Sequence, residues 1–126
     1  MERIVLVTGG FDPLHSGHIA YFKAAKKLGT KLIVGINSDE WLARKKGKHF
    51  MPFHERCSIV EELSVVDQVI GFNDDDDSAC NAIFQALSTH GNIKLIFANG
   101  GDRTNTTTPE YATYGDMPNV EFVFGV

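Results

Sequence analysis

Short apolar runs alternate with segments of helical periodicity along this chain of 126 residues. The first run, residues 3–8, is continuously apolar from Ile4 to Val7, as expected of a strand that is buried on both faces. The same patterns predict strands at 31–36, 68–72, 94–98 and 120–124, and helices at 16–28, 39–45, 53–63, 79–89 and 110–114. This alternation predicts an α/β fold: a Rossmann-like parallel sheet with helices on both faces, formed by residues 1–126 as a single domain.

The composition is that of a globular protein and argues against several function classes. Hydrophobic residues make up 43% of the chain, enough for a packed core. The formal net charge of −4 argues against a nucleic-acid scaffold, which is usually basic. No stretch approaches the roughly 20 apolar residues that span a bilayer, and the first residues lack a secretory signal. Cys57 and Cys80 have no metal-type spacing, so we expect reduced thiols in a cytoplasmic protein. From the charge and the lack of a long apolar stretch, we expect neither nucleic acid nor a membrane as a partner.

The most informative segment is residues 9–18, Gly-Gly-Phe-Asp-Pro-Leu-His-Ser-Gly-His, between the first strand and the first helix. Glycines let the backbone approach phosphate oxygens, and a helix N-terminus favours anions. His15 and His18 are three residues apart, so both can face one ligand, and imidazole or imidazolium can donate to a phosphate. Gly17 leaves room for a phosphate that a side chain would block. The alternative is that one of the histidines is a core or capping residue.

Three loops follow predicted strands, at 8–18, 37–48 and 99–108, where parallel sheets bind their ligands. The second loop ends in a basic segment, residues 44–48, which either contacts an anionic ligand or is a solvated surface. Arg56 either binds the ligand or forms an ion pair with Glu55 or Glu62. The acidic run at 74–77 is expected to cap the N-terminus of the helix at 79–89.

The segment from Thr8 to His18 resembles the first motif of the cytidylyltransferase-like nucleotidyltransferases, a family with a dinucleotide-fold core. The resemblance covers nearly the whole chain and continues, in order, through residues 36–40, 44–48, 54–56, 66–69 and 100–102. Within that family the chain looks most like glycerol-3-phosphate cytidylyltransferase and the adenylyltransferase domain that acts on a heptose 1-phosphate.

The resemblance implies a set of site residues. It gives catalytic roles to His15, His18 and Lys45. It implies nucleotide-binding roles for Thr8, Gly9, Gly10, Phe11, Gly17, Lys48, Arg56, Gly100, Gly101 and Asp102. It implies contact with the phosphorylated substrate for Asp12, Lys45 and Lys46. No residue is expected to bind a metal directly.

The activity that the resemblance implies is transfer of CMP (or AMP) from CTP (or ATP) to a small sugar or polyol phosphate, with release of pyrophosphate. The attacking phosphate is already an anion, so the reaction needs alignment and charge neutralisation, which histidine and lysine can supply. Mg²⁺ is expected to be bound mainly through the nucleotide phosphates. Relatives are commonly dimers, so we expect a homodimer, with residues 49–67 in part of the interface.

Two departures from the family pattern leave alternatives open. The sequence stops before the Ser/Thr-rich motif and helix that relatives carry after the last strand, so either it is a truncated form or residues 103–108 substitute for this lid. Ser78 or its acidic neighbours, and Asn99, stand where relatives have lysines, which leaves the identity of the phosphorylated substrate open. A non-catalytic nucleotide-binding module, or a phosphopantetheine- or mononucleotide-type adenylyltransferase, therefore remains possible. A dinucleotide-dependent oxidoreductase is disfavoured because the first turn lacks Gly-x-Gly-x-x-Gly spacing.

Overall fold

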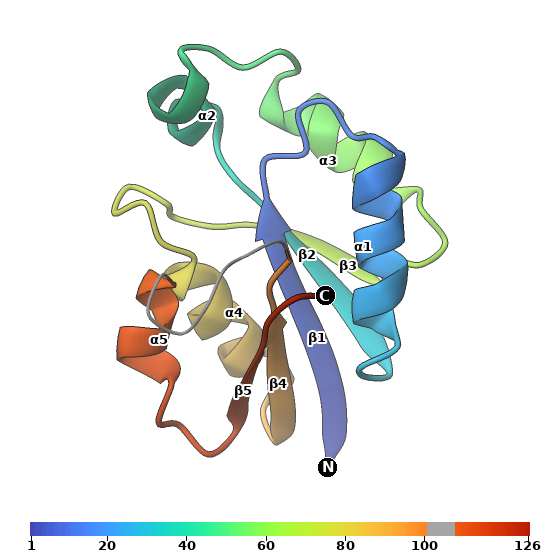
Figure 1. Cartoon of the computed structure of the whole chain (residues 1–126), viewed down its shortest axis with the longest axis vertical. Coiled ribbons are helices and arrows are strands. Elements are labelled where there is room, and N and C mark those ends of the chain that lie inside the picture. Colours follow the sequence, from blue (N-terminus) through green and yellow to red (C-terminus); the bar gives the residue numbers. More distant parts are fainter. Residues whose placement is uncertain (101–107) are drawn as a thin grey trace.

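The computed structural model describes residues 1–100 and 108–126 and contains a five-stranded sheet with flanking helices (Figure 1). The elements are, in chain order, β1 (Glu2–Gly9), α1 (Ser16–Lys26), β2 (Lys31–Ile36), α2 (Asp39–Lys46), α3 (Phe53–Glu61), β3 (Gln68–Gly71), α4 (Cys80–His90), β4 (Ile93–Ala98), α5 (Pro109–Tyr114) and β5 (Val120–Val123). Each predicted strand and helix is present, and no end differs from the predicted end by more than two residues.

The sheet is entirely parallel, in the order β3-β2-β1-β4-β5. β1 lies at its centre and pairs with both β2 and β4. The side chains from Ile4 to Val7 have no exposed surface, because helices cover both faces of this strand. The predicted Rossmann-like α/β fold is therefore confirmed.

Two apolar layers hold the helices against the sheet. Phe22 and Ala25 of α1 and Val60 of α3 pack on one face, while Ala82 and Ile83 of α4 pack on the other. Figure 1 shows α1 and α3 on one side of the strands and α4 and α5 on the opposite side. Alternate residues of β1 serve the two layers, so the central strand belongs to both cores.

The strand order creates a switch point beside β1. From β1 the chain proceeds through β2 to the edge strand β3, then crosses back to form β4 on the other side of β1. The loops after β1 and β4 consequently lead to opposite faces of the sheet, and the carboxyl edge between two such strands is where parallel sheets usually bind their ligands. α2 lies beyond the end of β2, on this side of the molecule (Figure 1).

The start of α4 corrects one expectation. Ala79 is the N-cap residue and makes no side-chain cap. Ser78, which follows the acidic residues at 74–77, accepts the backbone N–H of Cys80 on its Oγ at 3.3 Å, so the prediction that the acidic residues cap the helix is wrong. Instead, the backbone N–H of Ala79 donates to Oε2 of Glu110, at 2.6 Å. Glu110 is buried and comes from α5, so a distant carboxylate holds the start of α4.

None of the helices in the described ranges is long and apolar enough to cross a membrane.

Asp67 joins three parts of one edge of the fold. Its Oδ2 accepts hydrogen bonds from Nζ of Lys26 on α1 and from the backbone N–H of Leu32 on β2. Burial raises the pKa of this carboxyl, but the hydrogen bonds from Lys26 and Leu32 outweigh that effect and leave the pKa below its usual value. The ionised carboxylate therefore stabilises the folded chain.

We expect Asp67→Asn to lower the free energy of unfolding by about 1 kcal/mol at pH 7. Because the pKa of Asp67 is lowered on folding, its contribution is complete above the unfolded value of about 3.9 and disappears as the pH falls through the folded value. Urea unfolding from pH 7 to pH 3 measures the difference between variant and wild type. Asp116→Asn, at an exposed position, is the control. A difference that does not narrow in acid would contradict this assignment.

Candidate active site

The turn after β1 is built around Phe11. Its φ of 52° lies in the left-handed region, which side chains with a β-carbon rarely adopt. The ring is buried and folds under the end of the strand, where a Cβ on Gly9 would lie 2.9 Å from it. A Cβ on Gly10 would lie 2.7 Å from Leu42 of α2. Both glycines therefore allow close packing, and α2 rests directly on this turn.

His15 and His18 together cap the N-terminus of α1. The backbone N–H of Gly17 donates to Nδ1 of His15, and the backbone N–H of His15 donates to Nδ1 of His18, both at 3.1 Å. The ring centroids are 3.9 Å apart. The two imidazoles thus lie side by side, and Nε2 of each ring is the atom that can meet a ligand. The capping interpretation is correct for both residues and is compatible with a ligand-binding role.

These hydrogen bonds select one form of each ring. An Nδ1 that accepts a backbone N–H carries no proton, so the neutral ring carries its proton on Nε2. Burial, together with the neighbouring charge of His15, lowers the pKa of His18. The sequence left open whether imidazole or imidazolium faces the ligand; in the neutral form of either ring, this geometry makes Nε2 the donor.

Packing fixes the orientation of the histidine pair. The ring of Phe11 meets that of His18 edge-on, with centroids 5.1 Å apart, and meets Phe22 in the same manner, also at 5.1 Å. A Cβ on Gly17 would lie 2.8 Å from Cε1 of His15. The space at Gly17 is therefore needed first by a histidine ring, before any phosphate.

The basic end of α2 lies against the histidine loop. Nζ of Lys46 donates to the backbone oxygen of Asp12 at 2.7 Å and lies 3.0 Å from its Oδ2. Nζ of Lys45 lies 5.6 Å from the centroid of the Trp41 ring, and Lys48 is exposed. The structure thus brings the end of α2 that bears Lys45 and Lys46 to the loop that carries His15.

The carboxylate of Asp12 is occupied by protein groups. It accepts the backbone N–H groups of Phe50 and Met51, at 2.6 and 2.7 Å, and its side chain is 1% exposed. Burial raises its pKa, but the hydrogen bonds from Phe50, Lys46 and Met51 together lower it. Contact between Asp12 and the phosphorylated substrate therefore stays a prediction, and what the structure shows is a link between the first loop and the chain before α3.

Arg56 is the most deeply buried charged residue in the part of the chain that the structure describes, with 1% of its surface exposed. Its guanidinium donates to Gly10 O (2.9 Å), Asn37 O (2.8 Å), Met51 O (2.9 Å) and Asp39 Oδ1 (2.7 Å). These acceptors come from the loops after β1 and β2 and from the segment before α3. Arg56 therefore joins three loops at one point beneath the site.

This environment corrects one reading of Arg56. The ion pair expected with Glu55 or Glu62 is wrong, because the carboxylate partner is Asp39. Burial raises the pKa of Asp39, but the hydrogen bond from Arg56 is among the interactions that outweigh this effect, and the pKa is lowered. The nucleotide-binding role implied for Arg56 stays a prediction, since its hydrogen bonds in this structure are to the protein itself.

A buried carboxylate that sequence reasoning missed lies on the other side of the second loop. Asp74 is 2% exposed. Its carboxylate accepts Nδ2 of Asn37 (2.9 Å), the backbone N–H of Ser38 (2.8 Å) and Oγ of Ser38 (2.7 Å). Burial raises the pKa of Asp74, but these hydrogen bonds outweigh it and the pKa is lowered. Nothing in a run of four aspartates distinguishes the first from its neighbours, so the sequence carries no signal for this role.

The other wall of the candidate site, at the carboxyl edge of the sheet, comes from the end of β4. Tyr21 of α1 donates from its hydroxyl to the backbone oxygen of Ala98, at 2.6 Å, and a Cβ on Gly100 would lie 3.3 Å from the Tyr21 ring. Asn99 is buried and its backbone accepts the N–H of Val126 at 3.0 Å. α1 and the last residues of the chain thus meet at this wall.

The remaining predicted positions are Thr8, Gly101 and Asp102. The methyl group of Thr8 lies against β2, where a Cβ on Gly35 would be 3.0 Å from it. Gly101 and Asp102, predicted to bind the nucleotide, lie outside the described residues, as do residues 103–107 of the candidate lid. Among the residues that are described, no three histidine, cysteine or acidic side chains gather as a metal site.

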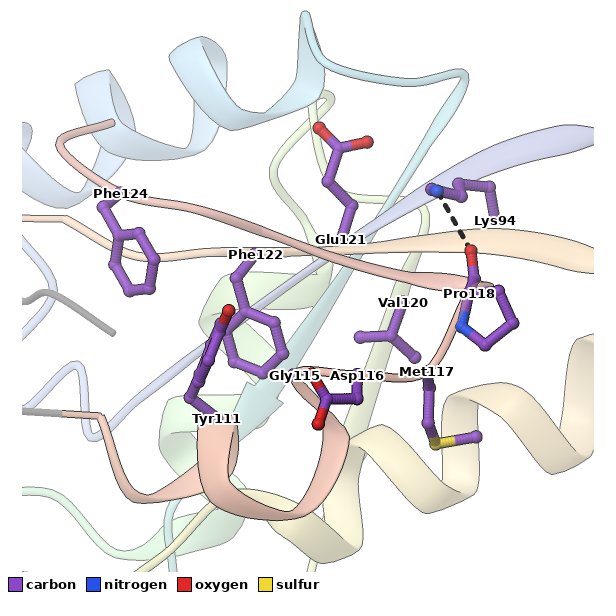
Figure 2. Close-up of a pocket in the computed structure, with 10 residues that line it drawn as sticks. All are labelled: Lys94, Tyr111, Gly115, Asp116, Met117, Pro118, Val120, Glu121, Phe122 and Phe124. Atoms are coloured by element: carbon purple, nitrogen blue, oxygen red, sulfur yellow. Dashed lines mark hydrogen bonds between the residues drawn. The ribbon is translucent and has the colours of Figure 1, made fainter. Parts of the chain in front are cut away.

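A separate hollow of about 560 Å³ lies between α5 and the edge strand β5. Tyr111, Asp116, Phe122 and Phe124 point toward it (Figure 2). None of the predicted site residues lines it, so it is not part of the candidate active site.

Parts of known proteins are similar in sequence to this chain. A protein named bifunctional protein HldE from Erwinia tasmaniensis is 38% identical over 113 residues, which cover 80% of this chain and 24% of that protein. HldE from Blochmanniella floridana is 47% identical over 77 residues, covering 60% of this chain and 16% of the relative. The chain therefore spans about a quarter or less of these relatives.

Solved structures share the fold. A lipopolysaccharide core biosynthesis protein from Thermoplasma volcanium has a TM-score of 0.73 and 29% identity, over 100% of this chain and 98% of that one. A protein from Archaeoglobus fulgidus has a TM-score of 0.68 at 17% identity, over 100% of this chain and 90% of that one, which shows similarity of fold alone. The cytidylyltransferase-like family model matches residues 6–122. The chain is therefore a member of the cytidylyltransferase-like nucleotidyltransferase family.

Proposed function

We propose that this chain transfers CMP or AMP from CTP or ATP to a small sugar or polyol phosphate and releases pyrophosphate. The observation that carries the proposal is the pair of imidazoles at the start of α1, with ring centroids 3.9 Å apart, beside the basic end of α2. A sugar phosphate is favoured as acceptor because a structural neighbour along its full length is described as a lipopolysaccharide core biosynthesis protein.

In the proposed reaction an oxygen of the acceptor phosphate attacks the α-phosphorus of the nucleotide. The bond between this phosphorus and the bridging oxygen breaks, and pyrophosphate leaves with the bonding electrons. The acceptor oxygen is anionic, so no general base is needed. The chain has to align the two phosphates and neutralise charge on their oxygens.

The residues present suit these two tasks. His15 and His18 can each donate from Nε2 to a phosphate oxygen, at the positive end of α1. Lys45 and Lys46 supply positive charge from α2. Donors held in place before the reaction stabilise the transition state without reorganising, and removal of one such donor typically costs about 10²-fold to 10³-fold in turnover.

The site fits a nucleotide that brings its own metal. The carboxylate of Asp12 in the histidine loop already accepts hydrogen bonds from Phe50 and Met51. The histidines and lysines beside it are hydrogen-bond donors or cations, whereas Mg²⁺ prefers oxygen ligands. When bound, Mg²⁺ would neutralise charge on the nucleotide phosphates and hold them together. The residues that would meet the metal-bound phosphates are His15, His18 and Lys45.

A screen for pyrophosphate release tests the proposal directly. CTP and ATP are each combined with Mg²⁺ and a panel of sugar and polyol phosphates. We expect release that requires both a nucleotide and an acceptor, with one nucleotide preferred. A chain that binds a nucleotide tightly but releases no pyrophosphate with any acceptor would instead be a binding module, and the proposal would be wrong.

The paired histidines should matter more for turnover than for binding. We expect His18→Ala to reduce kcat by about 10²-fold or more while the dissociation constant of the nucleotide changes much less. His54→Ala is the control, because His54 is exposed on α3. Equal losses in kcat and in binding would show that His18 supplies ground-state affinity.

The form of the rings can be observed without substrate. We expect the neutral rings of His15 and His18 to carry their proton on Nε2, since each Nδ1 accepts a backbone N–H. Long-range ¹⁵N–¹H NMR correlations distinguish this form from the Nδ1–H tautomer and from imidazolium. Because its pKa is lowered, His18 should become charged only below about pH 6.5. A charged His18 at neutral pH would contradict the capping geometry.

A further inference from the structure

The loop that follows β3 holds α2 at two points. Near the start of α2, the Asp74 carboxylate accepts three hydrogen bonds from Asn37 and Ser38. Near the end of α2, Arg44 donates to the backbone oxygen of Asp74 at 2.7 Å and to Oδ1 of Asp77 at 2.9 and 3.1 Å. Side chains therefore fasten α2, which lies beyond the sheet, to the neighbouring loop.

Ser38 links Asp74 to the first turn of α2 through two hydrogen bonds. Its hydroxyl donates to Asp74 Oδ1 and accepts the backbone N–H of Trp41, at 3.0 Å. The single hydroxyl hydrogen is thus directed to the carboxylate, and the lone pairs face the first turn of α2. Such an arrangement strengthens the N-cap, because the two hydrogen bonds polarise each other.

From these contacts we infer that Asp74 is a positioning residue for the nucleotide phosphates: through Ser38 it sets the orientation of α2 and so the placement of Lys45 and Lys46. The inference rests on the proposed function, because it assigns those lysines to the phosphate site. Asp74 itself does not touch the nucleotide. It is buried, and its carboxylate accepts hydrogen bonds from Asn37 and Ser38 at the start of α2.

The sharpest variant is Asp74→Asn. It keeps the shape of the side chain, but whichever way the amide turns, an NH₂ group replaces one of two oxygens that now accept hydrogen bonds. Asp75→Asn is the matched control, because Asp75 is exposed in the same loop and loses the same charge. Dissociation constants for MgATP and MgCTP are measured by calorimetry, and thermal unfolding confirms that each variant is folded.

We expect Asp74→Asn to weaken binding of the preferred nucleotide by about 10-fold and Asp75→Asn to leave it within about 2-fold. A double-mutant cycle then locates the effect. In a Lys45→Ala/Lys46→Ala background, Asp74→Asn should weaken binding by less than about 2-fold, because the cations that it positions are gone. Full weakening in that background would overturn the inference.

Ser38 provides the test should Asp74→Asn fail to fold. We expect Ser38→Ala to weaken nucleotide binding and Ser38→Thr, which keeps the hydroxyl, to restore it. Equal affinity of the alanine and threonine variants would also overturn the inference. The two proposals fail differently: if wild type bound neither nucleotide, the proposed function itself would be wrong, whereas normal binding by the Asp74 and Ser38 variants would refute only the positioning role.

Discussion

The guanidinium of Arg56 is the contact on which the arrangement of the site depends. A buried charge is costly unless it is paired and fully hydrogen-bonded. Here Asp39 supplies the opposite charge, and backbone oxygens of three loops supply the remaining acceptors. Because these acceptors must converge on one group, the loops after β1 and β2 and the chain before α3 have a single mutual arrangement. Removing the guanidinium would leave several buried oxygens unsatisfied at once.

The rest of the site is held by two kinds of interaction: the packing of the strands, and hydrogen bonds from side chains in the loops. Backbone hydrogen bonds between the strands and apolar packing against the helices fix where each loop begins. Beyond the ends of the strands, side chains position the second loop. Arg56 donates hydrogen bonds to Asn37 and Asp39 on one side, and Asp74 accepts hydrogen bonds from Asn37 and Ser38 on the other. The second loop therefore lies between the buried cation of Arg56 and the buried anion of Asp74. These contacts explain how the short helix α2, which lies beyond the sheet, keeps a defined position.

The sequence predicts the fold well because the information is local. An apolar run such as 4–7 is typical of a strand covered on both faces, and the glycines and histidines of residues 9–18 indicate a ligand loop. The roles of Arg56 and Asp74 could not be predicted, because each depends on partners from other loops. The acidic run shows the difficulty: local rules predict a helix cap, whereas a distant glutamate, Glu110, meets the start of α4 and Asp74 serves α2.

The bond between Val126 and Asn99 has a practical consequence. It places the last residue beside the end of β4, close to Gly100, whereas Met1 precedes β1 at the opposite edge of the sheet (Figure 1). Any polypeptide that continues from Val126 starts beside the end of β4, at the same edge of the sheet as the proposed site. Affinity tags, fluorophores and fusion partners are therefore better attached at the amino terminus, at the opposite edge of the sheet (Figure 1).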